Sequence, residues 1–301
     1  MRMDKLFGPV TALSIVLFSL LSPPLMRGGE TLEWRDKMEP IAARTYLCRR
    51  AASPIVIDGK LDEAAWALAA WTEDFVDIEG VAKPTPRLRT RAKLLWDDQY
   101  LYIAAELQEP HVWATLTNHD SVIFRDPDFE IFIDPKRETE PYYEFEMNAL
   151  NATWDLRLDK PYLDGGKPHN EWEIEGARTA VEVQGTLNNA SDVDRGWTVE
   201  VAFPWKSLGA FARHEGPPAE GEQWRMNFSR VEWQITTTNG AYRKIDGRAE
   251  DNWVWSATGV IDMHRPEMWG RVQFTAQSPS AAAAVDPVPG AAARSAVLAV
   301  Y

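Results

Sequence analysis

This chain of 301 residues alternates polar and apolar side chains most clearly in Asp126-Pro127-Asp128-Phe129-Glu130-Ile131-Phe132-Ile133-Asp134. Successive side chains of a β-strand point to opposite faces of the sheet, so Phe129, Ile131 and Ile133 share one face. The opposite face carries Asp128, Glu130, Phe132 and Asp134. Because the apolar face is the one that enters a core, the stretch predicts a half-buried antiparallel strand with three carboxylates on its other face.

The same alternation recurs along the chain and indicates the fold class. Residues 89–96 and 100–107 alternate on either side of Asp97-Asp98-Gln99, which predicts a hairpin. Further strands are predicted at residues 143–148, 181–184, 197–203, 224–233, 253–256 and 269–274. Helical patterns are confined to residues 61–66 and 204–208. We therefore predict an all-β fold, an antiparallel β-sandwich of immunoglobulin-like or jelly-roll-like type with a few short helices.

The amino-acid composition narrows the kinds of partner and site that the protein can have. Lys and Arg number 32 against 45 Asp and Glu, a formal net charge of −13 that disfavours nucleic acid and anionic lipid as partners. Cys48 is the only cysteine in the sequence, so an intrachain disulfide and a thiolate metal cluster are excluded. The 14 Trp residues indicate either a thick aromatic core or a surface on which sugars stack.

The ends of the chain differ from its middle. Residues 1–5 carry two basic groups and residues 6–21 form an uncharged, mostly apolar run shorter than a membrane span, so residues 1–29 are predicted to be a signal peptide. We predict a linker at 30–44, one domain at 45–276 and an Ala/Pro-rich tail at 277–301. The protein is thus expected to be secreted or periplasmic, with no membrane contact beyond the export signal. Polysaccharides are available there, whereas nucleotide cofactors are scarce.

The acidic face of residues 126–134 allows four interpretations. It can be a solvated strand face, or it can accept hydrogen bonds from sugar hydroxyls. Its carboxylates can ligate calcium. They can also act as acid and base in glycoside cleavage, which requires two carboxyl groups at a set spacing across a cleft.

The aromatic residues divide into two groups by their neighbours in the sequence. The first group occupies apolar positions of strands or helices and is predicted to be core: Trp66, Trp71, Trp96, Trp197 and Trp205. The second lies in or near polar loops, where a ring can stack on the C–H face of a pyranose: Trp113, Phe124, Trp154, Trp172, Trp253 and Trp269.

Several familiar sites have no sequence support. The five histidines show no spacing that would place two rings on one metal, and no serine-hydrolase or nucleotide-binding motif occurs. Residues 58–63 superficially resemble a calcium loop but lack the alternating ligands of an EF-hand. We expect Asp62, or the Asp58-Gly59 turn, to cap the short helix that follows.

Four segments in order, residues 54–66, 95–102, 128–135 and 196–205, carry a family resemblance. Their sequences and spacing resemble those of the family 9 carbohydrate-binding modules of the DOMON-like superfamily, over roughly residues 45–275. The resemblance implies a sugar-binding antiparallel β-sandwich. It also implies structural calcium and an association with xylanases and other plant-polysaccharide enzymes.

The resemblance also suggests where a sugar would bind. Family members hold a terminal sugar between two tryptophans; the first position is similar to Phe124, and the second falls near Met263-His264. An arginine of the family appears here as Glu146, followed by Asn148, and the segment 148–155 supplies polar groups and a ring. The candidate sugar-binding residues are Phe124, Asp126, Asp128, Glu146, Asn148, Trp154 and His264. No residue is assigned to a metal.

The leading hypothesis is a secreted protein that binds a polysaccharide or oligosaccharide in carbohydrate catabolism, without catalytic activity of its own and with glycoside hydrolases as partners. One alternative is a haem-binding electron-transfer domain of the same superfamily, for which the available ligands are Met147, Met226, Met263 and His264. A second alternative is a glycoside hydrolase that cleaves O-glycosyl bonds with Asp128 or Glu130.

Overall fold

A computed structural model describes residues 41–80, 82–277 and 285. Its strands are β1 (Thr45–Arg50), β2 (Val76–Asp77), β3 (Thr90–Trp96), β4 (Tyr100–Gln108), β5 (Asp128–Asp134), β6 (Tyr142–Asn148), β7 (Thr153–Leu158), β8 (Pro168–His169), β9 (Arg178–Gln184), β10 (Gly196–Pro204), β11 (Gln223–Glu232), β12 (Ile235–Thr238), β13 (Ala241–Lys244), β14 (Asp251–Val254) and β15 (Gly270–Thr275). Its helical segments are α1 (Ala64–Leu68), α2 (Trp205–Leu208) and the single turns η1 (Ile123–Arg125), η2 (Tyr162–Asp164), η3 (Gly209–Phe211) and η4 (Pro266–Met268). The predicted signal peptide and nearly all of the predicted tail lie outside the described residues.

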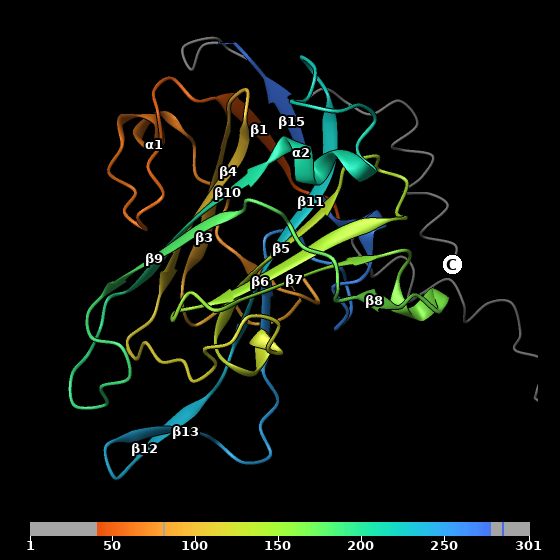
Figure 1. The fold of residues 1–301 in the computed structure, drawn as a ribbon. Helices are drawn as coiled ribbons and strands as arrows, with labels where there is room; N and C mark the ends of the chain where they lie inside the picture. Colours follow the sequence, from red (N-terminus) through yellow and green to blue (C-terminus); the bar gives the residue numbers. More distant parts are fainter. Residues whose placement is uncertain (1–40, 81, 278–284, 286–301) are drawn as a thin grey trace, which may run out of the picture.

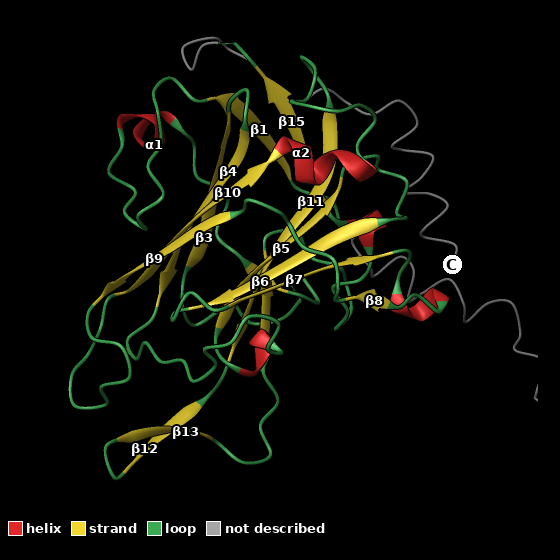
Figure 2. Cartoon of the chain, viewed as in Figure 1, coloured by secondary structure: helices red, strands yellow, loops and turns green. Residues whose placement is uncertain are grey.

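The strands form one long curled sheet, with short helices at its margins (Figures 1 and 2). The strand order is β8-β7-β6-β5-β11-β15-β1-β3-β4-β10-β9, and β14 joins the end of β11 and pairs with β2. Strands β12 and β13 form a separate hairpin that projects from the body of the molecule (Figure 1). The prediction of an all-β sandwich is confirmed.

Strand β1 gives the sheet its mixed character. It pairs in parallel with β15 on one side and with β3 on the other, whereas the other strand pairs in the described part of the chain are antiparallel. Residues 45–49 pair with residues 271–275, so β1 brings the two ends of the predicted domain together.

The main core lies between the two halves of the curled sheet. Apolar side chains of β5, β6 and β11 meet those of β3, β4 and β10, including Ile131, Phe145, Leu94, Ile103 and Val199. Burying one apolar face of each half in this way stabilises the fold by about 25 cal/mol for each Å² removed from water. A smaller cluster around Trp66 lies under α1, and another around Phe132, Tyr142 and Trp269 lies on the outer face of β5–β7. The outer face of β5–β7 is therefore apolar at one end and acidic at the other.

The local predictions can now be compared with the structure. The hairpin of residues 89–107 is confirmed as β3 and β4, paired from Thr90–Leu107 to Trp96–Leu101. The predicted cap of the first helix is wrong: Glu63 occupies the N-cap position and makes no side-chain cap hydrogen bond. The Gly59 N–H instead donates to Glu200 at 2.8 Å, so the turn docks on β10.

Of the tryptophans predicted to be core, four are buried: Trp66, Trp96, Trp197 and Trp205. The fifth, Trp71, is half-buried, with the guanidinium of Arg91 4.1 Å and the ammonium of Lys93 4.3 Å from the centre of its ring. Among the described residues, no helix has the length and apolar character needed to cross a membrane.

Candidate functional site

The outer face of the sheet carries a row of side chains that crosses four neighbouring strands. Glu130 of β5 lies directly opposite Glu146 of β6 on one side and Ser229 of β11 on the other. Trp154 of β7 lies opposite Glu146. Directly opposite residues of antiparallel strands project from the same face, so the row runs Trp154, Glu146, Glu130, Ser229. Asp128, two residues before Glu130, extends this acidic row along β5.

The carboxyl groups of this face are buried. Asp128, Glu130 and Glu146 are no more than 5% exposed, and Glu144 on the same face is 6% exposed. Burial raises the pKa of Glu130 to about 7 and that of Glu144 to about 8. Burial and the neighbouring Glu130 also raise the pKa values of Asp128 and Glu146 well above their ordinary range. The solvated-face interpretation of the acidic strand is therefore wrong.

Two of these carboxylates also fix backbone segments. Asp128 Oδ1 accepts a hydrogen bond from the Val231 N–H at 2.9 Å, which holds the end of β11. Glu146 Oε2 accepts the Phe124 N–H at 3.1 Å, which places the η1 turn over the end of β6. Phe124 is consequently held beside the acidic row by the carboxylate that lies opposite Trp154.

Asp126 and Asn148 lie next to this row but are engaged by the chain itself. Asp126 accepts hydrogen bonds from the N–H groups of Thr115 and Leu116 at 2.7 and 2.8 Å and from the Asn148 amide at 3.0 Å. Asn148 also accepts the N–H groups of Leu150 and Ala152. Both residues are at most 1% exposed. Their polar groups hold the loop before η1 and the turn after β6.

Three aromatic residues near the acidic row are exposed or half-buried. Phe124 of η1 is 38% exposed, and Tyr162 of η2 is 40% exposed. Trp154 is half-buried, packs against the cluster around Phe132, and donates its indole N–H to Asn170 at 3.2 Å. Burial raises the pKa of the Tyr162 hydroxyl, and the charges of Glu144 and Glu146 raise it further.

His264 packs against one of these aromatic residues. Its Nδ1 lies 2.8 Å from the Tyr142 hydroxyl, and its ring packs edge-on against Tyr162 with centroids 4.4 Å apart. Burial lowers the pKa of His264 to about 4, so the imidazole is neutral near pH 7. The His264 side chain is half-buried and packs against the ring of Tyr162.

The other tryptophans that were predicted to stack on a sugar are placed differently. Trp113, Trp253 and Trp269 are buried, so the prediction that they offer a stacking surface is wrong. Trp172 is half-buried and stacks on Tyr143 inside the molecule. The sequence analysis missed Tyr162 and Glu144. The turn-forming run Pro161-Tyr162-Leu163-Asp164-Gly165-Gly166 is the signal that could have found Tyr162.

The structure also shows where the candidate haem ligands and the candidate glycosidase carboxylates lie. Met147 and Met226 lie in the main core, whereas Met263 belongs to the cluster on the outer face and His264 contacts Phe132 of that cluster. The sheet therefore separates the two groups of candidate haem ligands. Oxygens of Asp128, Glu130 and Glu146 lie within 4.8 Å of one another, on adjacent strands of one face. They lie side by side, not across a cleft.

The fold is a β-sandwich, and the outer face of β5–β7 carries buried carboxylates with aromatic residues next to them. The chain belongs to the carbohydrate family 9 binding domain-like family, whose model matches residues 57–277. The family predicted from the four sequence segments is thereby confirmed.

Curated relatives agree with this assignment, and solved structures agree with the fold. The chain is 28% identical over 160 residues to endo-1,4-beta-xylanase A of Thermotoga maritima and 26% identical over 157 residues to exoglucanase XynX of Acetivibrio thermocellus. Each match covers 51% of this chain but only 12% of the relative. A family 9 carbohydrate-binding module from Caldicellulosiruptor kristjanssonii, solved with cellotriose, superposes with a TM-score of 0.50 at 16% identity, covering 81% of this chain and all of that one. A proposed carbohydrate-binding protein from Bacteroides uniformis gives a TM-score of 0.56 at 14% identity, covering 77% and 100%.

Proposed function

We propose that this protein binds a β-linked oligosaccharide or polysaccharide on the outer face of β5–β7. The observation that carries the proposal is the position of two aromatic residues, Phe124 and Trp154, next to one carboxylate, Glu146. Glu146 holds the backbone of Phe124 and lies opposite Trp154 in the sheet register. Sugars present C–H faces that stack on aromatic rings and hydroxyl groups that need polar partners, and this face offers rings with polar groups between them.

The predicted residues take different parts in this proposal. Phe124, Trp154 and Tyr162 supply stacking surfaces. Asp128 and Glu146 hold the end of β11 and the η1 turn from beneath the face, while Asp126 and Asn148 hold the surrounding loops and His264 packs against Tyr162. The xylanase and exoglucanase relatives, and the module solved with cellotriose, suggest xylo- and cello-oligosaccharides as the first ligands to test.

We also propose that the protein works outside the cytoplasm beside glycoside hydrolases. The predicted signal peptide at residues 1–29 and the similarity to an endo-1,4-beta-xylanase and an exoglucanase support this setting. Amino-terminal sequencing of the protein from a culture fraction tests it: a mature start near residue 30 is expected, and an intact start in the cytoplasmic fraction would contradict it.

The binding proposal is tested by isothermal titration of the full chain with cello- and xylo-oligosaccharides. Phe124→Ala, Trp154→Ala and Tyr162→Ala are each expected to weaken binding about tenfold, because a lost ring contact of roughly 1.4 kcal/mol corresponds to that factor. Trp71→Ala is the matched control, since Trp71 is also half-buried but packs with Arg91 and Lys93 of β3, in the other half of the sheet. Equal losses in Trp71→Ala, or no heat with any sugar, would contradict the proposed face.

A further inference from the structure

A histidine and three carboxylates from separate segments of the chain converge beside β7. His119 and Asp120 lie in the loop before η1, Asp155 lies in β7, and Glu173 lies in the loop after β8. The ligand atoms of His119, Asp120 and Glu173 lie within 4.8 Å of one another. This histidine–carboxylate group lies apart from the acidic row, because Asp155 and its neighbour Trp154 point to opposite faces of β7.

All three carboxylates approach the same nitrogen of His119. Its Nε2 lies 3.0 Å from Glu173 Oε2, 3.3 Å from Asp120 Oδ1 and 3.7 Å from Asp155 Oδ1. A protonated Nε2 carries a single N–H, which can donate well to one of these oxygens but not to all three. A metal ion can bind several ligand atoms at once. The arrangement around Nε2 therefore fits a metal ion better than a proton.

Asp155 gives a second, independent indication of a ligand. It is 4% exposed, and burial raises the pKa of its carboxyl to about 6. Its Oδ2 accepts a hydrogen bond from the Ile174 N–H. Its Oδ1 faces His119 Nε2 at 3.7 Å, which is longer than a hydrogen bond. Buried polar atoms in folded proteins nearly always have a close partner, so this oxygen points to a ligand between itself and the imidazole.

The donor set and its spacing favour zinc. An imidazole nitrogen is a preferred ligand of Zn²⁺, whereas Ca²⁺ and Mg²⁺ take oxygen ligands. Bonds of about 2.0–2.2 Å place the ligands of a tetrahedral Zn²⁺ about 3.3–3.6 Å apart. The distances of 3.0, 3.3 and 3.7 Å from Nε2 lie close to this range. The other ring nitrogen, Nδ1, lies 3.0 Å from the Thr153 hydroxyl, a contact of the kind that orients a metal-binding imidazole.

The charge of the group also suits a divalent cation. Three carboxylates face one imidazole, so the group carries a charge of about −2 even when the imidazole is protonated. We propose that His119, Asp120 and Glu173 bind one Zn²⁺, with Asp155 as the fourth ligand. The first three side chains are exposed, so the ion can reach them from solvent. The ion connects the loop that leads into η1 with β7 and with the loop after β8, whether or not the protein binds a sugar.

The first experiment is isothermal titration of the full chain with Zn²⁺ at pH 7.5, after removal of metal with EDTA and dialysis. We expect one equivalent of Zn²⁺ to bind. Replacing a ligand, in His119→Gln or Glu173→Gln, should weaken binding by about 100-fold or more. Thr153→Val should weaken it by about tenfold, because it removes only the hydroxyl that orients the imidazole.

His169→Gln is the matched control. His169 also pairs with two carboxylates, but it uses a different nitrogen for each: Nε2 lies 2.8 Å from Asp159 and Nδ1 lies 3.1 Å from Glu171. Because these two carboxylates lie on opposite sides of the ring, they do not converge on one nitrogen as those of His119 do. His169→Gln should therefore bind Zn²⁺ as the wild type does.

Thermal unfolding and Co²⁺ absorption guard against misfolded variants. Zn²⁺ at about 100 times its Kd should raise the melting temperature of the wild type by about 5 °C or more. His119→Gln should melt as the metal-free wild type does and lose this shift, because His119 is exposed. Co²⁺ in the wild type should show the visible absorption of a four-coordinate ion, and Zn²⁺ should displace it. Asp155 is left unchanged in these variants, since it also holds the Ile174 backbone.

Four outcomes would overturn the zinc site. Zn²⁺ binding that survives in His119→Gln and Glu173→Gln would place the ion elsewhere. An equal loss in His169→Gln would show that the protein binds Zn²⁺ at surface histidines in general. No heat and no Co²⁺ absorption with the wild type would mean that a proton alone occupies Nε2. A thermal shift with Ca²⁺ as large as that with Zn²⁺ would contradict the choice of zinc. Zn²⁺ binding without sugar binding would support this site and contradict only the proposed function.

Discussion

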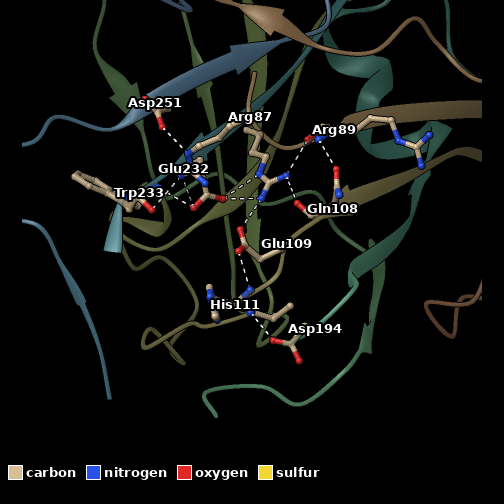
Figure 3. Close-up of polar contacts among 12 residues, drawn as sticks. Arg87, Arg89, Gln108, Glu109, His111, Asp194, Glu232, Trp233 and Asp251 are labelled. Carbon is tan, nitrogen blue, oxygen red and sulfur yellow. Dashed lines mark hydrogen bonds and ion pairs between the residues drawn. The ribbon is translucent and has the colours of Figure 1, made fainter. Parts of the chain in front are cut away.

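Replacing Arg230 with methionine is expected to destabilise the protein strongly, because this arginine is fully buried among acidic partners. Its guanidinium donates to Glu232 at 2.6 and 3.1 Å and to Glu109 at 2.8 Å. It also donates to the Thr90 hydroxyl at 3.1 Å and the Gln108 carbonyl at 2.9 Å. Arg230 thus connects β11 with β3 and the end of β4, and joins the two halves of the sheet. Figure 3 shows its partners Glu109, Glu232 and Gln108.

The expected loss in the free energy of unfolding depends on the carboxyl groups that remain without Arg230. Glu109 and Glu232 are at most 4% exposed and would lose their shared cation. Arg87, which is 43% exposed, lies 3.5 Å from the second oxygen of Glu232 and would compensate in part. Removing one partner of a buried ion pair costs about 3–5 kcal/mol, and we take the lower end, about 3 kcal/mol. For a domain of this size that corresponds to a fall in melting temperature of about 8 °C.

The pH dependence of the loss distinguishes charge from packing. Burial and the neighbouring Glu232 raise the pKa of Glu109 to about 9, so this carboxyl holds a proton in the folded protein while it is ionised in the unfolded chain. Its contribution is therefore fully present below the unfolded pKa and is lost as the pH rises from about 4.5 towards 9. Removing Arg230 raises the pKa of Glu109 further, so in the variant the decline continues to higher pH, and Arg230→Met should lose more stability at pH 9.5 than at pH 7.5.

Urea unfolding at the two pH values measures the effect, with Arg243→Met as the exposed control on β13. Adding Glu109→Gln and Glu232→Gln to Arg230→Met should recover about 2 kcal/mol, because the uncompensated charges are removed. A loss of less than about 1 kcal/mol, or the same loss at both pH values, would refute the charge argument.

Three further predictions concern other parts of the fold. Gly59→Ala should cost at least about 2 kcal/mol in urea unfolding, because its φ is +87° and an added Cβ would lie 2.6 Å from the Val181 carbonyl carbon; Gly240→Ala, at φ +75° with open space around it, should cost about 1 kcal/mol. The pKa of His264 is about 4 in the folded protein and lies below its unfolded value, so protons favour unfolding and the wild type should lose up to about 3 kcal/mol of stability between pH 6.5 and 4. His264→Phe should remove this loss, and an unchanged dependence on pH would contradict the prediction. Cys48, which is fully buried with a raised pKa, should react with a thiol reagent only on unfolding, and rapid reaction of the native protein would contradict its placement.

The sequence predicted the regular strands well because their pattern is local. Strands β3, β4, β5, β6 and β10 each alternate with period two, and a side chain's face can be counted from its neighbours. Strand β1 was read only as the start of the domain, since its partners on β15 lie more than 200 residues away and leave no local trace. The hairpin of β12 and β13 was missed although Asn239-Gly240, with φ of 52° and 75°, is a strong signal for a tight hairpin turn.

The site was predicted less completely, for a physical reason. Alternation places Asp128 and Glu130 on the outer face of their strand, but it does not show whether loops cover that face. Here the η1 turn docks on Glu146, and the segment containing His264 packs on Phe132 and Tyr162, so carboxylates expected in water or in an open site are buried. Trp253 and Trp269 were misplaced for the same reason, because a tryptophan next to polar loop residues can still point inward.

Strand β11 carries residues that face two of the acidic clusters described above. Ser229 faces the row of Glu130 and Glu146, and the next residue, Arg230, faces the opposite side with Glu109 and Glu232. On the Arg230 side the chain supplies its own cation. On the Ser229 side burial raises the pKa of Glu130 to about 7, so protons reduce the charge of the row in the folded protein. The stability that this proton provides is present below the unfolded pKa of Glu130 and is lost as the pH rises from about 4.5 through 7. Glu130→Gln should therefore reduce the loss of stability between pH 5.5 and 7.5 in urea unfolding, and an unchanged loss would show that Glu130 takes up no proton on folding.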